Sequence, residues 1–164
     1  MQIIGTVTSY LRIIGKQNHI KKSGDGGYKT ALNPDDIPET HQKFFREQKL
    51  YHIDGCNNCF VHAGFNRLRP FEGQREQDYF WDRTLWKNAV IFKEQIKEGS
   101  IFKIATQFNE IFIGHTGTMN FKTDKPMHIA NIWNLDTCGR GGKLTIMDIN
   151  TKEFWQSDPL LLIQ

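Results

Sequence analysis

Short runs of apolar and β-branched residues alternate along this chain with longer segments in which apolar residues recur at helical spacing. The short runs predict strands over residues 51–54, 58–62, 111–114 and 129–135. The helical spacing predicts one helix that starts near Pro38 and another over residues 77–98. Residues 143–149 and 153–157 predict a hairpin. Strands paired with helices, followed mostly by strands, are typical of a mixed α/β domain.

The two predicted helices differ in their start signals and in their apolar residues. Pro38 suits a first helical position, and Glu39 suits the positive end of the helix dipole. The residues predicted to be buried in and just after this helix are Phe44, Phe45 and Leu50. The apolar set of residues 77–98 is Phe80, Trp81, Leu85, Trp86 and Ile91. Residues 2–14 fit either a strand or the end of a helix, and the glycine-rich residues 21–27 predict an exposed loop.

Composition narrows the class of protein. With 164 residues the chain fits one ordinary domain, and its 12 Phe and 4 Trp residues supply enough apolar surface for a core. The net charge of +3 is too small to indicate a nucleic-acid partner, but it suits an anionic substrate if the positive charge gathers in a cleft. Only 3 cysteines favour a reducing compartment, so we expect a cytoplasmic protein. No membrane span and no secretory signal are visible in the sequence, so no membrane partner is expected.

Two predicted strands end in a histidine that is flanked by small residues. His62 directly follows the run that ends at Val61, and His115 follows a second apolar run and Gly114. A strand end holds a side chain firmly at the edge of a cleft, and imidazole binds transition metals near neutral pH. Glycines such as Gly64 and Gly114 would let a substrate or metal approach the backbone. The alternative is that both are ordinary strand-end histidines satisfied by their neighbours.

Five short motifs occur in order along the chain. They are Phe60-Val61-His62-Ala63-Gly64-Phe65, Trp81-Asp82-Arg83-Thr84-Leu85-Trp86, Phe112-Ile113-Gly114-His115-Thr116, Leu135-Asp136-Thr137 and Lys143-Leu144-Thr145-Ile146-Met147-Asp148. Each motif alone is short, whereas the ordered set is specific. The sequence resembles the C-terminal part of the calcineurin-like metallophosphoesterases, and within them the bacterial serine/threonine protein phosphatases. The resemblance extends from Gly5 to Asp158.

The resemblance implies a fold and roles for individual residues. The implied fold is α/β (α+β), a calcineurin-like β-sandwich flanked by helices and lacking its N-terminal half. His62 and His115 match two histidines that bind one metal of a dinuclear centre. Arg83 matches the arginine that binds the substrate phosphate, a role that suits its planar fork of donors. Asp82 would orient Arg83, cap its own helix or form a surface ion pair, and Asp136 would shape the floor of the cleft without ligating the metal.

The reaction implied by the resemblance is metal-dependent hydrolysis of a phosphomonoester. Two divalent ions, manganese with iron and zinc as alternatives, would hold a hydroxide that attacks phosphorus in line. The expected substrates are phosphorylated proteins or small phosphoesters. In this scheme no side chain of the chain acts as a covalent nucleophile.

The motifs that open the family's catalytic domain are absent from this sequence. They are Gly-Asp-x-His-Gly, Gly-Asp-x-x-Asp-Arg-Gly, and Gly-Asn-His followed by Asp or Glu, and they supply the remaining metal ligands. We therefore expect residues 1–164 to form a single partial domain that carries only the second half of the ligands. A missing N-terminal half or an oligomer partner would complete the site. The alternative is a non-catalytic fragment or interaction module that is inactive alone.

Two other sequence patterns offer different functions. Cys56 and Cys59 form a Cys-x-x-Cys pair of the kind found in zinc and redox sites, but they lie in a predicted hairpin and have no second pair. The arginines and aromatics that interleave as in a nucleic-acid stacking platform are Arg67, Arg69, Arg75, Arg83, Phe65, Phe71, Tyr79 and Trp81. The small net charge favours core aromatics with a solvated rim of arginines. A further hypothesis is that Arg67 and Arg69 line the approach of a phosphorylated substrate.

Overall fold

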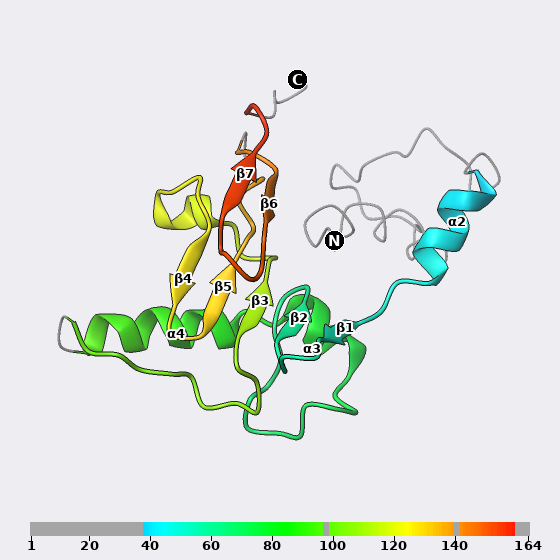
Figure 1. Cartoon of the computed structure of the whole chain (residues 1–164). Coiled ribbons are helices and arrows are strands. Elements are labelled where there is room, and N and C mark those ends of the chain that lie inside the picture. Colours follow the sequence, from blue (N-terminus) through cyan, green and yellow to red (C-terminus); the bar gives the residue numbers. More distant parts are fainter. Residues whose placement is uncertain (1–37, 97–98, 140–141, 160–164) are drawn as a thin grey trace, which may run out of the picture. The chain divides into compact units, whose positions relative to one another are not determined.

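The computed structural model describes residues 38–96, 99–139 and 142–159 (Figure 1). These residues belong to two compact units, which meet in sequence between Lys49 and Leu50. The sequence predictions for residues 2–14 and 21–27 lie outside the described residues.

In the first unit the described residues form the helix α2 (Glu39–Arg46). The predicted start is confirmed, because the carbonyl of Pro38 accepts hydrogen bonds from the backbone N–H groups of His41 at 2.9 Å and Gln42 at 3.0 Å. The predicted burial of Phe44 is wrong, since its side chain is 54% exposed. The residues one helical turn away from it are Thr40, His41, Glu47 and Gln48. All four are polar, so this short helix has no apolar stripe around Phe44.

The second unit is built on a five-stranded mixed sheet in the order β1-β2-β3-β5-β4 (Figure 1). Its strands are β1 (Tyr51–Ile53), β2 (Cys59–Val61), β3 (Ile111–Ile113), β4 (Met127–Ile129) and β5 (Ile132–Asn134). The strands β2, β3 and β5 run parallel, and β1 and β4 pair antiparallel at the two edges. The first three predicted strands are confirmed, and so is the mixed α/β class.

The single strand predicted over residues 129–135 is instead a hairpin, made by the end of β4 and by β5. Its turn contains Ala130 in the left-handed region, at φ 56°. The buried Asn131 fixes the turn, because its side-chain oxygen accepts the N–H of Ile104 at 2.9 Å and its carbonyl accepts the N–H of Ile111 at 2.9 Å. The apolar run conceals this turn because its two turn residues are neither Gly nor Pro.

The single helix predicted over residues 77–98 is divided into α3 (Glu76–Trp81) and α4 (Thr84–Gln95). The break is at Asp82, whose backbone is extended, with ψ 132°. The break changes the phase of the two helices, so part of the predicted apolar set is wrong. Leu85 and Trp86 are buried as predicted, but Trp81 is 49% exposed and Ile91 is 47% exposed.

The core of this unit lies between one face of the sheet and the two helices. Alternate strand residues face the same side, and those that pack with the helices form one cluster that includes Cys59, Val61, Ile111, Ile113, Ile132, Tyr79, Leu85, Trp86 and Ala89. The opposite face carries Phe60, Phe112 and Trp133, which are in register on neighbouring strands. The predicted C-terminal hairpin is confirmed as β6 (Thr145–Met147) and β7 (Phe154–Gln156).

Candidate functional site

Three parallel strands end at the same edge of the sheet, and each is followed there by a chemically active residue. His62 follows β2 directly, His115 lies two residues after β3, and Asp136 lies two residues after β5. Because parallel strands bring their carboxyl ends together, these side chains come from one edge of the sheet. The sequence prediction that His62 and His115 each follow the end of a strand is confirmed.

The two histidines lie close together and are held by the backbone. Their ring centroids are 5.2 Å apart, with an angle of 60° between the ring planes. The N–H of Gly114 donates to the carbonyl of His62 at 2.8 Å, which ties the two strand ends together. His115 adopts the left-handed conformation with φ 64°, which is uncommon for a residue other than glycine. Burial, with a smaller effect of nearby His115, lowers the pKa of His62 to about 4.

Arg83 reaches the same place from the break between α3 and α4. Its Nε lies 3.3 Å from Nε2 of His115. Trp81 contacts this imidazole edge-on, with ring centroids 5.2 Å apart and an interplanar angle of 80°. The structure therefore brings together all three predicted site residues, His62, Arg83 and His115. The sequence interpretation missed Trp81, which it assigned to the buried set. No local pattern signals its exposure, because helical spacing continues through the break at Asp82.

Asp136 borders this group of residues. Burial raises the pKa of its carboxyl group, and the positive charge of Arg83 acts in the opposite direction. Its carbonyl accepts the N–H of Thr118 at 2.8 Å, which fixes the loop after His115 against the loop after β5. Within the described residues no set of three or more His, Cys, Asp and Glu side chains is arranged to hold a metal ion. The role of Asp136 at the floor of the site stays a prediction.

Of the three roles considered for Asp82, the structure supports the helix cap. Its Oδ1 accepts the N–H of Leu85 at 3.0 Å, in the first turn of α4. The same oxygen lies 2.8 Å from where a Cβ on Gly64 would be. The prediction that Gly64 leaves room for a substrate or metal is therefore wrong, because the side chain of Asp82 occupies that space.

Replacing Asp82 with alanine is expected to destabilise the fold by about 1 kcal/mol, because it leaves an N–H in the first turn of α4 without its side-chain acceptor. Urea unfolding measures the effect. Asp82→Asn keeps an acceptor oxygen and should lose much less stability than Asp82→Ala. The control is Glu94→Ala at an exposed position of the same helix. Equal losses for Asp82→Ala and Glu94→Ala would contradict the capping role.

The low pKa of His62 makes the stability of the metal-free protein depend on pH. The unfolded chain binds a proton at this residue below about pH 6.5, whereas the folded chain does so only near pH 4. Stability should therefore be highest above pH 6.5 and should fall by about 2 kcal/mol by pH 5. Chemical unfolding at several pH values in the presence of a chelator measures this slope. His62→Gln should flatten it, and an unchanged slope in that variant would rule out His62 as its source.

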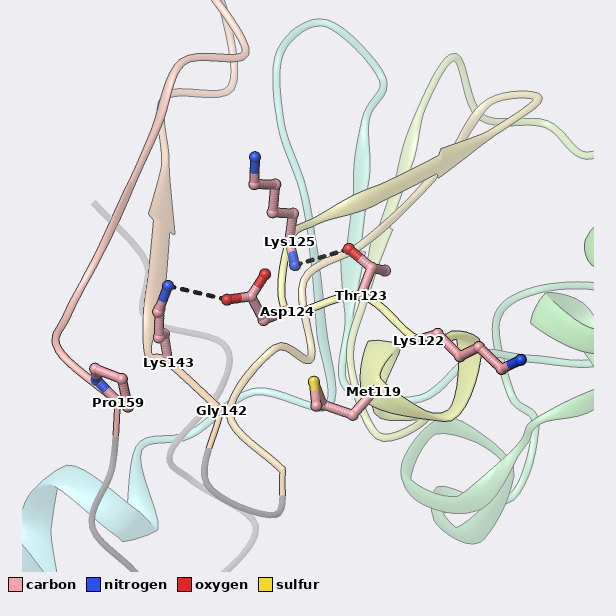
Figure 2. Close-up of a pocket in the computed structure, with 8 residues that line it drawn as sticks. All are labelled: Met119, Lys122, Thr123, Asp124, Lys125, Gly142, Lys143 and Pro159. Atoms are coloured by element: carbon pink, nitrogen blue, oxygen red, sulfur yellow. Dashed lines mark hydrogen bonds and ion pairs between the residues drawn. The ribbon is translucent and has the colours of Figure 1, made fainter.

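A hollow of about 570 Å³ lies among residues 119–125, 142–143 and 159 (Figure 2). It is lined by Met119, Lys122, Thr123, Asp124, Lys125, Gly142, Lys143 and Pro159. Asp124 and Lys143 form an ion pair across it at 2.9 Å, and this pair lowers the pKa of Asp124. None of the predicted site residues lines this hollow.

The two other sequence patterns have structural explanations. Cys56 is exposed in the β1–β2 turn, whereas Cys59 is fully buried in β2, and burial raises the pKa of its thiol to about 12. A buried thiol of this kind is unreactive, so the pair does not have the character of a redox site. The aromatics Phe65, Phe71 and Tyr79 are buried and pack edge-to-face in the core. These three aromatics therefore belong to the core, whereas Trp81, the fourth aromatic of that pattern, is exposed.

Comparison with known proteins assigns no family to this chain: neither models of protein families nor curated proteins match it. Among the described residues, no helix combines the length and the apolar character needed to cross a bilayer.

Proposed function

We propose that this chain is the C-terminal part of a metal-dependent phosphomonoesterase similar to the bacterial serine/threonine protein phosphatases. In this proposal the five-stranded sheet belongs to a calcineurin-like sandwich. The observation that carries the proposal is the close approach of His62, His115 and Arg83. These residues are far apart in sequence, and they meet at the carboxyl edge of three parallel strands.

The two histidines fit part of a metal site. The lowered pKa of His62 keeps its imidazole neutral at physiological pH, which is the form that binds a metal. Two nitrogen ligands are too few for a hard cation, which prefers carboxylate oxygens. The remaining ligands would come from a missing N-terminal half or from a partner. A bound pair of manganese, iron or zinc ions would neutralise charge on the phosphoryl oxygens.

Arg83 is placed to bind the phosphate beside these imidazoles. Its Nε contacts Nε2 of His115, and a guanidinium group has further N–H donors in the same plane. Such a planar fork binds phosphate oxygens in pairs and keeps its charge at all physiological pH values. The positive charge of Arg83 acts on the neighbouring carboxyl group of Asp136, against the effect of burial on its pKa. The substrate would be a phosphorylated protein or a small phosphoester.

The alternative proposal is a non-catalytic fragment or interaction module. It is favoured by the small number of ligands, because within the described part of the chain no third metal-binding side chain joins the two histidines. In both proposals the protein would act in the cytoplasm, where its three cysteines stay reduced.

Hydrolysis of an aryl phosphate by the purified chain, with and without Mn²⁺, tests the proposal. Turnover that requires Mn²⁺ and falls by about 100-fold in Arg83→Ala is the expected result for a competent site, because the variant loses its phosphate donor. The matched control is Arg75→Ala, which removes an exposed arginine paired with Asp78. Turnover that needs no metal, or that is equal in the two variants, would contradict a metallophosphoesterase. Absence of turnover would support a chain that carries only half of the ligands, and metal binding without turnover is also what the non-catalytic alternative predicts.

A further inference from the structure

Trp81 is a large apolar side chain that stays half in water beside the proposed phosphate site. Its indole is 49% exposed, whereas Trp86, five residues later, is completely buried. Single exposed apolar side chains are common on protein surfaces. The side chains that are more exposed than that of Trp81 include Leu68, Ile101 and Trp155. What distinguishes Trp81 is its contact with His115, the residue that Arg83 also contacts.

The indole and the guanidinium are positioned together. Trp81 contacts the imidazole of His115 edge-on, with ring centroids 5.2 Å apart, and the Nε of Arg83 lies 3.3 Å from the same imidazole. Both side chains flank Asp82, whose bond to the N–H of Leu85 fixes the break between α3 and α4. The aromatic surface and the phosphate donor are thus held in a fixed relation by the backbone at this break.

We propose that Trp81 is a specificity-determining residue that favours phosphate esters of aromatic alcohols, such as phenolic esters, over those of aliphatic alcohols. This inference rests on the proposed phosphomonoesterase function. A phosphate bound by Arg83 would lie beside His115, and Trp81 contacts the same imidazole. Aromatic rings attract one another when their centroids are about 4.5–7 Å apart, and a phenyl ester can reach the indole at such a distance. A short aliphatic ester presents too little surface for this contact.

A purely structural role for Trp81 makes a different prediction. If the indole only held the imidazole of His115 in place, its removal would weaken the binding of every phosphate ester equally. A specificity role weakens the binding of aromatic esters alone. The ratio of two affinities therefore separates the two roles.

The experiment compares the equilibrium binding of phenyl phosphate and ethyl phosphate to the full chain in the presence of Mn²⁺, by calorimetry. Phenyl phosphate is expected to bind at least about fivefold more tightly, a size typical of aromatic stacking. Trp81→Ala should remove this preference and leave the affinity for ethyl phosphate unchanged, and Trp81→Phe should keep part of the preference. The matched control is Trp155→Ala, since Trp155 is also exposed, at 58%, but lies on β7.

The outcomes distinguish the specificity role of Trp81 from the proposed phosphate site. Equal affinities for the two esters, or an equal loss of both in Trp81→Ala, would overturn the specificity role. The phosphate site itself would stand in that case if Arg83→Ala weakens the binding of both esters. Binding of both esters that is unaffected by Arg83→Ala, or no binding of either, would overturn the proposed function and the inference with it. Thermal unfolding of each variant verifies that it folds.

Discussion

Replacing His115 with alanine is expected to lower the affinity of the chain for Zn²⁺ or Mn²⁺ by at least about 100-fold. Loss of a group that merely orients a metal ligand costs 10- to 100-fold in affinity, so loss of a ligand itself should cost no less. The remaining imidazole, His62, would then be a single nitrogen donor, because among the described residues no set of three or more potential metal ligands is found. Calorimetric titration with each metal, followed by the ring signals of the histidines in NMR spectra, measures the change.

The control for this variant is His41→Ala, which removes an exposed imidazole from α2. It should leave metal affinity unchanged. His62→Ala should match the effect of His115→Ala, since the two rings lie 5.2 Å apart and would bind the same ion. Metal affinity that survives both substitutions would show that the ion binds elsewhere. The alternative from the sequence, two ordinary strand-end histidines with no metal-binding role, would then be correct.

Replacing Trp86 with alanine is expected to destabilise the fold by about 3–5 kcal/mol, the largest loss of stability among the variants considered. The side chain is completely buried and packs in the cluster between α4 and the sheet. It also contacts Phe121 edge-to-face, with ring centroids 6.0 Å apart. Since small domains are stable by only about 5–15 kcal/mol, this variant should unfold at much lower urea concentration.

Two further variants isolate the cause of this loss. Trp86→Phe should cost less, about 1–2 kcal/mol, because Nε1 of Trp86 has no hydrogen-bond partner among the described residues and only packing is lost. Trp155→Ala makes the same chemical change at an exposed position and should cost less than about 0.5 kcal/mol. Similar midpoints of urea unfolding for Trp86→Ala and Trp155→Ala would contradict the assigned core.

The sequence was informative about the strands and their ends. The apolar runs before His62 and His115 are short and fully buried in the structure, and such runs are a local property that a sequence shows directly. The pairing of these strands, parallel and next to each other, is a long-range property. The prediction that His62 and His115 lie close together therefore rested on the order of the motifs and on the family resemblance, not on hydrophobic periodicity.

The parts that the sequence did not predict are governed by single polar side chains. Asp82 breaks the helix between α3 and α4 through one hydrogen bond, and Asn131 fixes the turn between β4 and β5 through another. Helical spacing continues across the first break and apolar character continues across the turn, so neither pattern shows the interruption. As a result Trp81 was predicted to be buried, and the structure leaves it exposed at the site.

The left-handed backbone conformation of His115 is unfavourable for any residue other than glycine. At φ 64° a side chain with a Cβ costs roughly 1 kcal/mol that glycine does not. The backbone alone would therefore favour replacement of this histidine. The same conformation is adopted by Asn57, Lys122, Ala130 and Lys152. Glycine adopts it without strain, so His115→Gly is expected to remove the imidazole at no cost to the backbone conformation. This variant would separate the proposed role of the side chain from the stability of the loop.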